Sequence, residues 1–219
     1  MSFVSYPKIE TCFARDVDGT KKLMPDVFRA PEIELLKNLN WEWTEKIDGT
    51  NTQIVWDGHR VTFGGRTERA DIPKSLLDYL ERTFGGIENE ELFEQKFGEN
   101  QVILFGEGYG PKIQKGGNYR DDVSFILFDV KIGDFWLERD SVEDIAKAFN
   151  IDVVPIIFHG TVEQAVQYVQ THPNSKVAAE HGKTYAAEGI VGRAPLGLKN
   201  RKGQRIMVKI KWVDMKELI

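Results

Sequence analysis

The sequence predicts an α+β protein built as one domain. Some short runs alternate apolar with polar residues, as strands do, and some longer runs repeat apolar residues every three or four positions, as helices do. The 219 residues contain no internal repeat, low-complexity tract or linker, and a chain of this length can bury one sizeable core or at most form two small domains. We therefore expect one domain over residues 1–219, with residues 1–40 forming an N-terminal extension packed on it.

Strands are expected where short apolar or alternating runs are bounded by turn residues. Such runs occupy residues 41–47, 52–56, 60–63, 101–105, 123–132, 153–158, 187–193 and 204–212. The dipeptides Asp48-Gly49 and Asp57-Gly58 are strong turn signals, so we expect a hairpin bend at each. In the last run a period of two places Lys209 and Lys211 on one face and the apolar side chains on the other.

Helices are expected where apolar residues recur at helical spacing after a starting signal. Pro31 lies in the first turn of a short helix over residues 32–38, and Pro73 opens a longer one through Leu80. A further helix is expected over residues 90–97. Ser141 and Thr161 are expected to cap two more helices, because a hydroxyl accepts a hydrogen bond from a first-turn amide.

The composition limits the class of protein. The formal net charge of −5 argues against a protein that coats nucleic acid non-specifically, although a local basic groove is compatible with it. No apolar run approaches the length of a membrane span, and no signal peptide is recognisable. The single cysteine, Cys12, excludes an internal disulfide and favours a reducing cytoplasm, and the four histidines lack the spacing of a zinc site.

The stretch that carries the functional argument is Glu45-Lys46-Ile47-Asp48-Gly49-Thr50-Asn51. Lys46 stands at the end of an expected strand, next to a bend that leaves its amine free to point into whatever the bend frames. A lysine in such a place is usually a solvated charge at a sheet edge. The stretch nevertheless resembles the nucleotidyl-acceptor motif of the covalent nucleotidyltransferases, which comprise DNA ligases, RNA ligases and mRNA capping enzymes. Its extended form is similar to that of the type-two phage RNA ligases.

The rest of the chain carries matching residues in the family's order. After Lys46 come Arg66, then Glu107 within Phe-Gly-Glu-Gly, then the segment 125–129, then Glu188 within Glu-Gly-Ile-Val, and finally Lys209-x-Lys211. The loop 110–116 also resembles the one that follows Glu107 in type-two RNA ligases. The resemblance extends over residues 41–212. It implies a nucleotidyltransferase (ligase adenylation) domain in which two antiparallel sheets flank a nucleotide cleft.

The resemblance implies a three-step reaction. A lysine amine attacks the α-phosphorus of ATP and releases pyrophosphate, AMP moves to a 5′-phosphate, and a 3′-hydroxyl then displaces AMP. Lys46 is the expected nucleophile. Because a free lysine is protonated at neutral pH, the neighbouring cations Lys209 and Lys211, together with Arg66 and a bound metal, are expected to disfavour its ammonium form and then to stabilise the phosphate oxygens.

The resemblance also implies the remaining roles. Glu107 accepts a hydrogen bond from a ribose hydroxyl, Arg66 holds a phosphate, and Glu188 binds Mg²⁺, with Mn²⁺ as a possible substitute. One phenylalanine stacks on adenine, either Phe125 or Phe128, because alternation places them on opposite faces. The nucleotide-binding set is completed by residues of the acceptor motif itself, namely Glu45, Asp48, Gly49 and Asn51.

Two domains found in relatives are not expected in this sequence. DNA ligases and capping enzymes carry an oligonucleotide-binding barrel after the last lysine motif, and larger phage RNA ligases carry a helical domain there. We therefore expect a minimal ligase whose weak, salt-sensitive grip on RNA is helped by an accessory protein. Its own contacts would come from a basic set that could equally be a solvated loop: Lys112, Lys115, Arg193, Lys199, Arg201, Lys202 and Arg205.

The sequence thus predicts an ATP-dependent RNA ligase that joins 5′-phosphate and 3′-hydroxyl ends through a lysyl-AMP intermediate. It would act in the cytoplasm, in that of a bacterial host if the protein is encoded by a phage. One alternative keeps the chemistry and changes the acceptor, as in a DNA nick ligase or a capping-type enzyme. Another is a non-catalytic module that binds nucleotide or RNA, although such a module would not need a lysine nucleophile.

Overall fold

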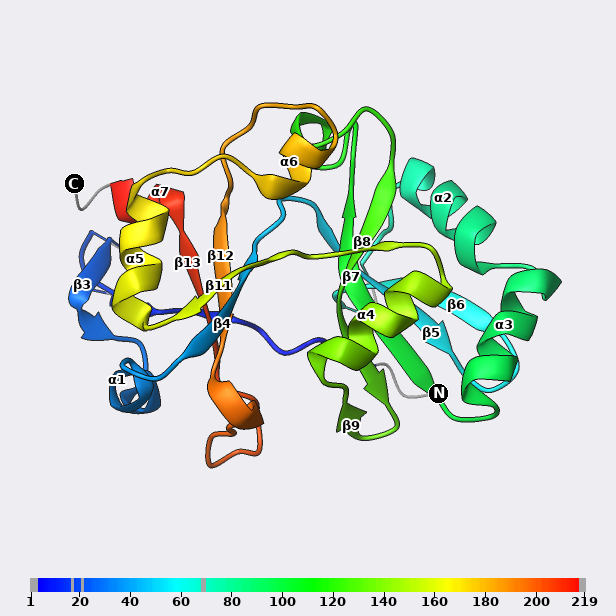
Figure 1. Cartoon of the computed structure of the whole chain (residues 1–219), viewed down its shortest axis with the longest axis horizontal. Coiled ribbons are helices and arrows are strands. Elements are labelled where there is room, and N and C mark those ends of the chain that lie inside the picture. The colour runs from blue at the N-terminus through cyan, green and yellow to red at the C-terminus, as the bar shows by residue number, and fades with distance from the viewer. Residues whose placement is uncertain (1–3, 17, 21, 68–69, 217–219) are drawn as a thin grey trace. The chain divides into compact units, whose positions relative to one another are not determined.

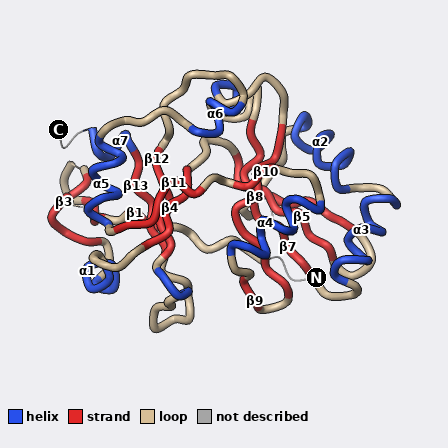
Figure 2. Tube along the Cα trace, in the orientation of Figure 1, coloured by secondary structure: helices blue, strands red, loops and turns tan. Residues whose placement is uncertain are grey.

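A computed structural model describes residues 4–16, 18–20, 22–67 and 70–216 of the chain. These residues form two compact units (Figures 1 and 2). Unit 1 comprises the described residues within Met1–Tyr6 and Asp48–Val154, and unit 2 comprises those within Pro7–Ile47 and Pro155–Ile219. The mixed α+β class is confirmed. The expectation of one domain with a separate N-terminal extension stays a prediction. None of the helices in the described ranges is both long and apolar enough to cross a membrane.

Unit 1 is built on a six-stranded sheet in which β10, β8, β7, β5 and β6 lie in that order and β9 pairs with β8. All pairs are antiparallel except β10 with β8. Its strands are β5 (Thr50–Trp56), β6 (Val61–Gly65), β7 (Val102–Tyr109), β8 (Ser124–Ile132), β9 (Phe135–Trp136) and β10 (Asp152–Val153), and a 3-10 turn, η1, covers Gly116–Asn118. Asp57 closes the expected hairpin between β5 and β6 by accepting hydrogen bonds from the amides of His59 and Arg60.

Three helices pack on one face of this sheet: α2 (Lys74–Phe84), α3 (Ile87–Phe97) and α4 (Arg139–Ala148). Leu76, Leu80 and Phe84 recur every four residues on α2, so all three point into the core. There they meet Ile54 and Trp56 of β5, which point to the same face because they are two residues apart. The helices therefore cover one face of the sheet only, and Phe105 and Phe128 belong to a separate aromatic cluster.

Unit 2 is built on a five-stranded sheet in the order β1, β13, β12, β4 and β11. Neighbouring strands are antiparallel except β1 with β13. Its elements are β1 (Glu10–Thr11), β2 (Phe13–Arg15), β3 (Leu23–Phe28), α1 (Pro31–Leu36), β4 (Trp41–Glu45), β11 (Ile156–Gly160), α5 (Val162–Gln170), α6 (Lys176–Glu180), β12 (Gly189–Arg193), the 3-10 turn η2 (Pro195–Gly197), β13 (Met207–Lys211) and α7 (Trp212–Met215).

The core of unit 2 lies on one face of its sheet. Trp41 and Trp43 of β4 stack there with ring centroids 5.8 Å apart, beside Val208 and Ile210 of β13. Ile33 of α1 packs into the same cluster, as expected for the helix that follows Pro31. The alternation expected in β13 is confirmed, since Val208 and Ile210 are buried while Lys209 and Lys211 lie on the other face.

Two expectations about the strands are corrected. No hairpin forms at Asp48-Gly49, because β4 pairs with β11 and β12 whereas β5 pairs with β6 and β7. The bend instead carries the chain from the sheet of unit 2 to that of unit 1. The single strand expected over residues 153–158 is divided between β10 and β11, because Pro155 has no amide to donate to a strand ladder.

The two expected helix caps have different outcomes. Thr161 forms a complete capping box with Gln164 at the start of α5, as expected. Ser141 caps no helix, because α4 already begins at Arg139, two residues earlier. The short helix α6, which the sequence analysis missed, begins after Ser175, whose hydroxyl accepts a hydrogen bond from the amide of Ala178.

Phe125 does not fit the adenine-stacking role considered for it. Its ring is fully buried against the edge of Phe84 and belongs to the core beneath α2, so no face is left for a ligand. Gly106 lies directly under this ring, and a methyl group there would overlap with it. Phe125 is therefore a structural residue of unit 1.

We predict that Phe125→Ala lowers the free energy of unfolding by about 3–5 kcal/mol, because it removes a buried aromatic ring and leaves a cavity. Phe135→Ala is the matched control on the same sheet, because Phe135 is 77% exposed, and its effect is expected to stay within about 0.5 kcal/mol. Urea unfolding followed by far-ultraviolet circular dichroism measures both variants. Equal losses in the two variants would contradict this placement of Phe125.

Candidate active site

Three strand ends of unit 2 meet at Lys46. Lys46 follows the last residue of β4, Glu188 precedes the first residue of β12, and Lys211 ends β13. Because β12 lies between β4 and β13 and runs antiparallel to both, its start lies beside their ends. The amide of Lys46 donates to the carbonyl of Gly189, and Gly189 is opposite Lys211 in the register, so the three residues are adjacent.

Glu188 forms an ion pair with each lysine. Its Oε2 lies 2.6 Å from Nζ of Lys46 and its Oε1 lies 2.5 Å from Nζ of Lys211. The three side chains are 23%, 14% and 30% exposed for Lys46, Glu188 and Lys211 respectively, so they are neither buried nor fully solvated. One carboxylate therefore holds two ammonium groups close together, an arrangement that neither lysine could keep without it.

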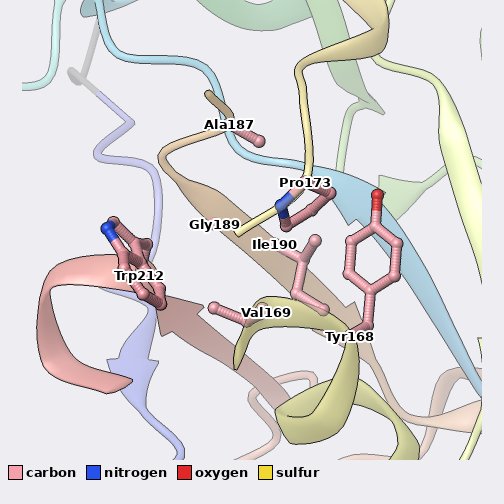
Figure 3. Close-up of a pocket in the computed structure, with 7 residues that line it drawn as sticks. All are labelled: Tyr168, Val169, Pro173, Ala187, Gly189, Ile190 and Trp212. Atoms are coloured by element: carbon pink, nitrogen blue, oxygen red, sulfur yellow. The ribbon is translucent and has the colours of Figure 1, made fainter. Parts of the chain in front are cut away.

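The backbone around Glu188 is fixed from both sides. Its carbonyl accepts a hydrogen bond from the amide of Trp212 at 3.0 Å. Gly189 approaches the carbonyl of Ile210 so closely that a Cβ atom would overlap with it. Apolar side chains enclose a narrow crevice beside this turn (Figure 3), lined by Tyr168, Val169, Pro173, Ala187, Gly189, Ile190 and Trp212. The ring of Trp212 also stacks on His172, with centroids 4.0 Å apart.

Lys209 lies on the same face of the sheet as Lys211, two residues earlier on β13. It is opposite Val191 in the register with β12, so it is further than Lys211 from the strand ends. The expectation that both lysines share one face is thus met. Lys211 is the one that lies at the strand ends, where it pairs with Glu188.

Glu45 has a different role from the nucleotide contact expected for it. Its side chain is buried, and its Oε1 accepts a hydrogen bond from the hydroxyl of Ser175. Its Oε2 accepts from the amides of Lys176 and Val177, at 2.9 and 3.3 Å. Both oxygens are thus used to hold the start of α6 against the end of β4, next to Lys46. Burial raises the pKa of Glu45, and the hydrogen bonds from Ser175, Val177 and Lys176 partly offset this.

Unit 1 carries the second half of the acceptor motif. Gly49 packs so closely against Gly108 and the side chain of Glu107 that any larger residue would overlap with them. The amide of Asp48 donates to the hydroxyl of Tyr119, which is itself fully buried. The glycine of the motif is therefore required by packing within this unit.

Asn51 and Glu107 are cross-strand neighbours on β5 and β7. The strand that was expected to end at residue 105 continues as β7 through Glu107 to Tyr109. Gly106 and Gly108 face the core, where Phe125 and Leu76 occupy the space of their missing side chains, so Glu107 points to the face opposite the helices. Asn51 Oδ1 is the only buried side-chain polar atom without a hydrogen-bond partner among the residues that the structure describes.

Phe128 lies in an aromatic cluster that includes a residue the sequence analysis missed. The ring of Tyr6 packs against Phe128 and Phe105, with centroids 5.0 and 5.1 Å away. The hydroxyl of Tyr6 donates to the fully buried carboxylate of Asp129 at 2.9 Å. The position of Asp129 within an otherwise apolar strand was the signal in the sequence that a buried hydrogen-bond donor must lie nearby. Arg66 is exposed, and its carbonyl accepts a hydrogen bond from Ser5.

The predicted site residues are therefore divided between the units. Lys46, Glu188 and Lys211 come together in unit 2, and Asn51 and Glu107 come together in unit 1. No group of three or more histidine, cysteine, aspartate or glutamate side chains suited to a metal occurs in the described part of the chain. Glu188 still fits the expected Mg²⁺ contact, because this ion often takes one or two carboxylates and completes its shell with phosphates and water.

Comparisons with known proteins show the family and the fold of this chain. The RNA ligase family model matches residues 39–211, so the chain belongs to the RNA ligase family. Its fold is similar to that of an RNA ligase variant from Naegleria gruberi with ATP and Mn (TM-score 0.60, 17% identity, 97% of this chain and 63% of that one). A second variant of the same ligase, with AMP and Mn, gives a TM-score of 0.60 at 19% identity over 96% of this chain and 63% of that one. The chain thus spans less than two thirds of the ligase it matches.

The pKa of Glu45 leads to a prediction about pH. Because the folded protein binds the Glu45 proton more tightly than the unfolded chain does, this residue should reduce stability as pH rises from about 4.3, the ordinary glutamate value, through its raised folded value. Glu45→Gln removes the titration at nearly constant volume. The stability of wild type relative to Glu45→Gln should therefore fall over this pH range, as measured by urea unfolding.

Glu163→Gln, on the exposed side of α5, is the control and should show no such trend. A rise in the stability of wild type relative to Glu45→Gln over the same pH range would show that the hydrogen bonds outweigh burial.

Proposed function

We propose that the protein is an ATP-dependent RNA ligase that forms a covalent AMP adduct on Lys46. The observation that carries the proposal is the ion cluster of Lys46, Glu188 and Lys211, found within the segment that the RNA ligase family model matches. A lysine whose Nζ is held by a carboxylate where three strands end has a fixed position. A fixed position is what a nucleophile needs and what a solvated surface lysine lacks.

In the proposed first step the Lys46 amine attacks the α-phosphorus of ATP. A nitrogen–phosphorus bond forms, the bond to the bridging oxygen breaks, and pyrophosphate leaves with the electron pair. The amine must be neutral to attack, yet Glu188 holds it as an ammonium at 2.6 Å. Before the attack Lys46 must leave Glu188 and give one proton to it or to solvent, and the second proton, lost as the nitrogen–phosphorus bond forms, goes to solvent or to the departing pyrophosphate. Lys211, on the other oxygen of Glu188, then offers a charge to the phosphate oxygens.

Glu188 is the residue proposed to hold a divalent cation, with Mg²⁺ as the expected ion and Mn²⁺ as an alternative. A carboxylate that engages a cation is less available to Lys46, so the same residue would couple cofactor binding to release of the nucleophile. The cation, when bound, neutralises phosphate charge.

The residues of unit 1 are proposed to bind the adenosine part of the nucleotide. Asn51 supports this, because its buried Oδ1 has no partner within the described residues and can accept a hydrogen bond from a ligand. Glu107, its cross-strand neighbour, is assigned to a ribose hydroxyl. Phe128 is the phenylalanine left for stacking on adenine, since Phe125 is buried. Arg66 is assigned to a phosphate.

The substrate is proposed to be RNA with a 5′-phosphate and a 3′-hydroxyl, and the compartment to be a reducing cytoplasm. Burial of Cys12 raises the pKa of its thiol to about 12, so this cysteine is an unreactive core residue, and it can stay reduced there. An accessory protein that adds RNA contacts stays a prediction from the sequence.

We predict that Lys46→Ala and Lys46→Arg both abolish adenylylation. Lys46→Arg keeps a positive partner for Glu188 but has no amine nucleophile, so it separates loss of chemistry from loss of the ion pair. Purified protein with Mg²⁺ and α-labelled ATP should take up an acid-labile label, whereas labelled GTP should give none. Denaturing electrophoresis measures the label, and Lys176→Ala, an exposed lysine of the same unit, is the control that should retain it.

A label that persists in Lys46→Arg would refute the assignment of Lys46. Wild type that takes up label only from GTP would favour a capping-type enzyme.

A second experiment distinguishes the acceptors. Pre-adenylylated protein should seal a nick with a ribonucleotide 3′ end faster than an all-DNA nick at equal salt, because the 2′-hydroxyl is a local feature a protein can bind. Faster sealing of the all-DNA nick would indicate a DNA ligase.

A further inference from the structure

The segment between Glu188 and Asp214 contains no acidic residue. Over the same stretch it carries seven basic residues, whereas the whole chain has 34 acidic and only 29 basic residues. They are Arg193, Lys199, Arg201, Lys202, Arg205, Lys209 and Lys211. It is the longest stretch of the chain without an acidic residue and the one with the most basic residues, so it needs a physical explanation.

The structure orders this segment as an extended hairpin. The strands β12 and β13 continue into a loop over residues 194–206, which projects beyond their ends (Figure 1, orange). An isolated bridge pairs Lys199 with Arg205, and the amide of Ile206 donates to the carbonyl of Leu198 at 2.9 Å. At the tip, Asn200 Oδ1 accepts hydrogen bonds from the amides of Lys202 and Gln204. The basic side chains thus extend from a turn that is held by its own hydrogen bonds.

The basic residues also continue towards Lys46 along one face of the sheet. Lys211 is opposite Gly189, Lys209 is opposite Val191, and Arg193 is opposite Met207, so all three cations lie on the face that Lys46 shares. Glu42 is opposite Arg193 on β4 and offsets part of its charge. Beyond Arg193 the hairpin tip adds three exposed cations, Lys199, Arg201 and Lys202.

The distance from the lysine cluster to the hairpin follows from the strand length. β12 has five residues, and at about 3.3 Å per residue it spans about 16 Å from the Glu188 end to the hairpin. Successive phosphates of one strand of duplex DNA are about 3.4 Å apart along the axis, and they are closer in A-form RNA, so the tip lies about five nucleotides or more away from Lys46.

We propose that the β12–β13 hairpin is a docking arm for the phosphate backbone of RNA at a distance of about five or more nucleotides from the reacting end. The inference rests on the proposed function, because it places the arm relative to Lys46. Lysine and arginine contacts with phosphates fix position and affinity without reading sequence. The arm therefore determines the length of RNA beyond the reacting end that tight binding requires.

The test compares a triple substitution in the arm with a matched one elsewhere. Lys199→Ala, Arg201→Ala and Lys202→Ala together remove three charges from the tip. The control combines Lys74→Ala, Arg82→Ala and Lys96→Ala, which remove the same three charges from exposed positions on α2 and α3. Fluorescence anisotropy with labelled nicked RNA duplexes measures affinity, and label from α-labelled ATP measures adenylylation of each protein independently of RNA.

We expect the arm variant to bind a duplex with long arms at least tenfold more weakly than wild type at low salt. The slope of its log affinity against log salt concentration should be less negative by about 2–3, because each phosphate contact with a duplex contributes about 0.9 to the size of that slope. A duplex with fewer than about five base pairs on each side of the nick should bind wild type and arm variant alike. The control variant should match wild type on every duplex.

The inference is overturned if the arm variant binds the long duplex as tightly as wild type, or if the control weakens binding equally. It is also overturned if the arm variant loses affinity only for vesicles containing an anionic lipid, which would make the hairpin a membrane contact. Failure of wild type to take up AMP, with arm-dependent RNA binding intact, would refute the proposed function and leave the docking arm.

Discussion

The shared carboxylate of Glu188 is the interaction on which the candidate site depends. Two lysine ammonium groups repel one another, and each is held in place because Glu188 offers one oxygen to each. The register of β4, β12 and β13 makes this possible, since three strand ends meet at one edge of the sheet. The fold of unit 2 thus places the proposed nucleophile, an acid and a second cation together.

Close packing sets the surroundings of this cluster. Gly189 lets β12 start against Ile210, and Gly49 lets the motif lie against Gly108 in unit 1, where side chains would overlap with the neighbouring backbone. Glu45 uses both carboxylate oxygens to hold α6 at the end of β4. The two glycines and Glu45 thus hold the backbone around the cluster in place, and the charged side chains of the cluster would perform the chemistry.

Sequence reasoning found most elements and the residues of the lysine cluster, because period-two patterns and short motifs are local signals. It could not show that Glu188 bridges Lys46 and Lys211, since that depends on pairing between strands far apart in the chain. It also misassigned Phe125 and Glu45. A phenylalanine and a carboxylate look alike in sequence whether they face a ligand or the interior, and only the core packing and the hydrogen bonds of Ser175 decide.

The central claim is that Glu188 and Lys211 act on Lys46 as one unit, and a double-mutant cycle tests it. The quantity to measure is the single-turnover rate of adenylylation in Glu188→Gln, Lys211→Ala and the double variant. We predict that each single substitution slows the reaction by about 10²-fold or more, and that the double variant is at most about tenfold slower than the worse single one. Effects that multiply fully would show that the two residues act independently and would contradict the account.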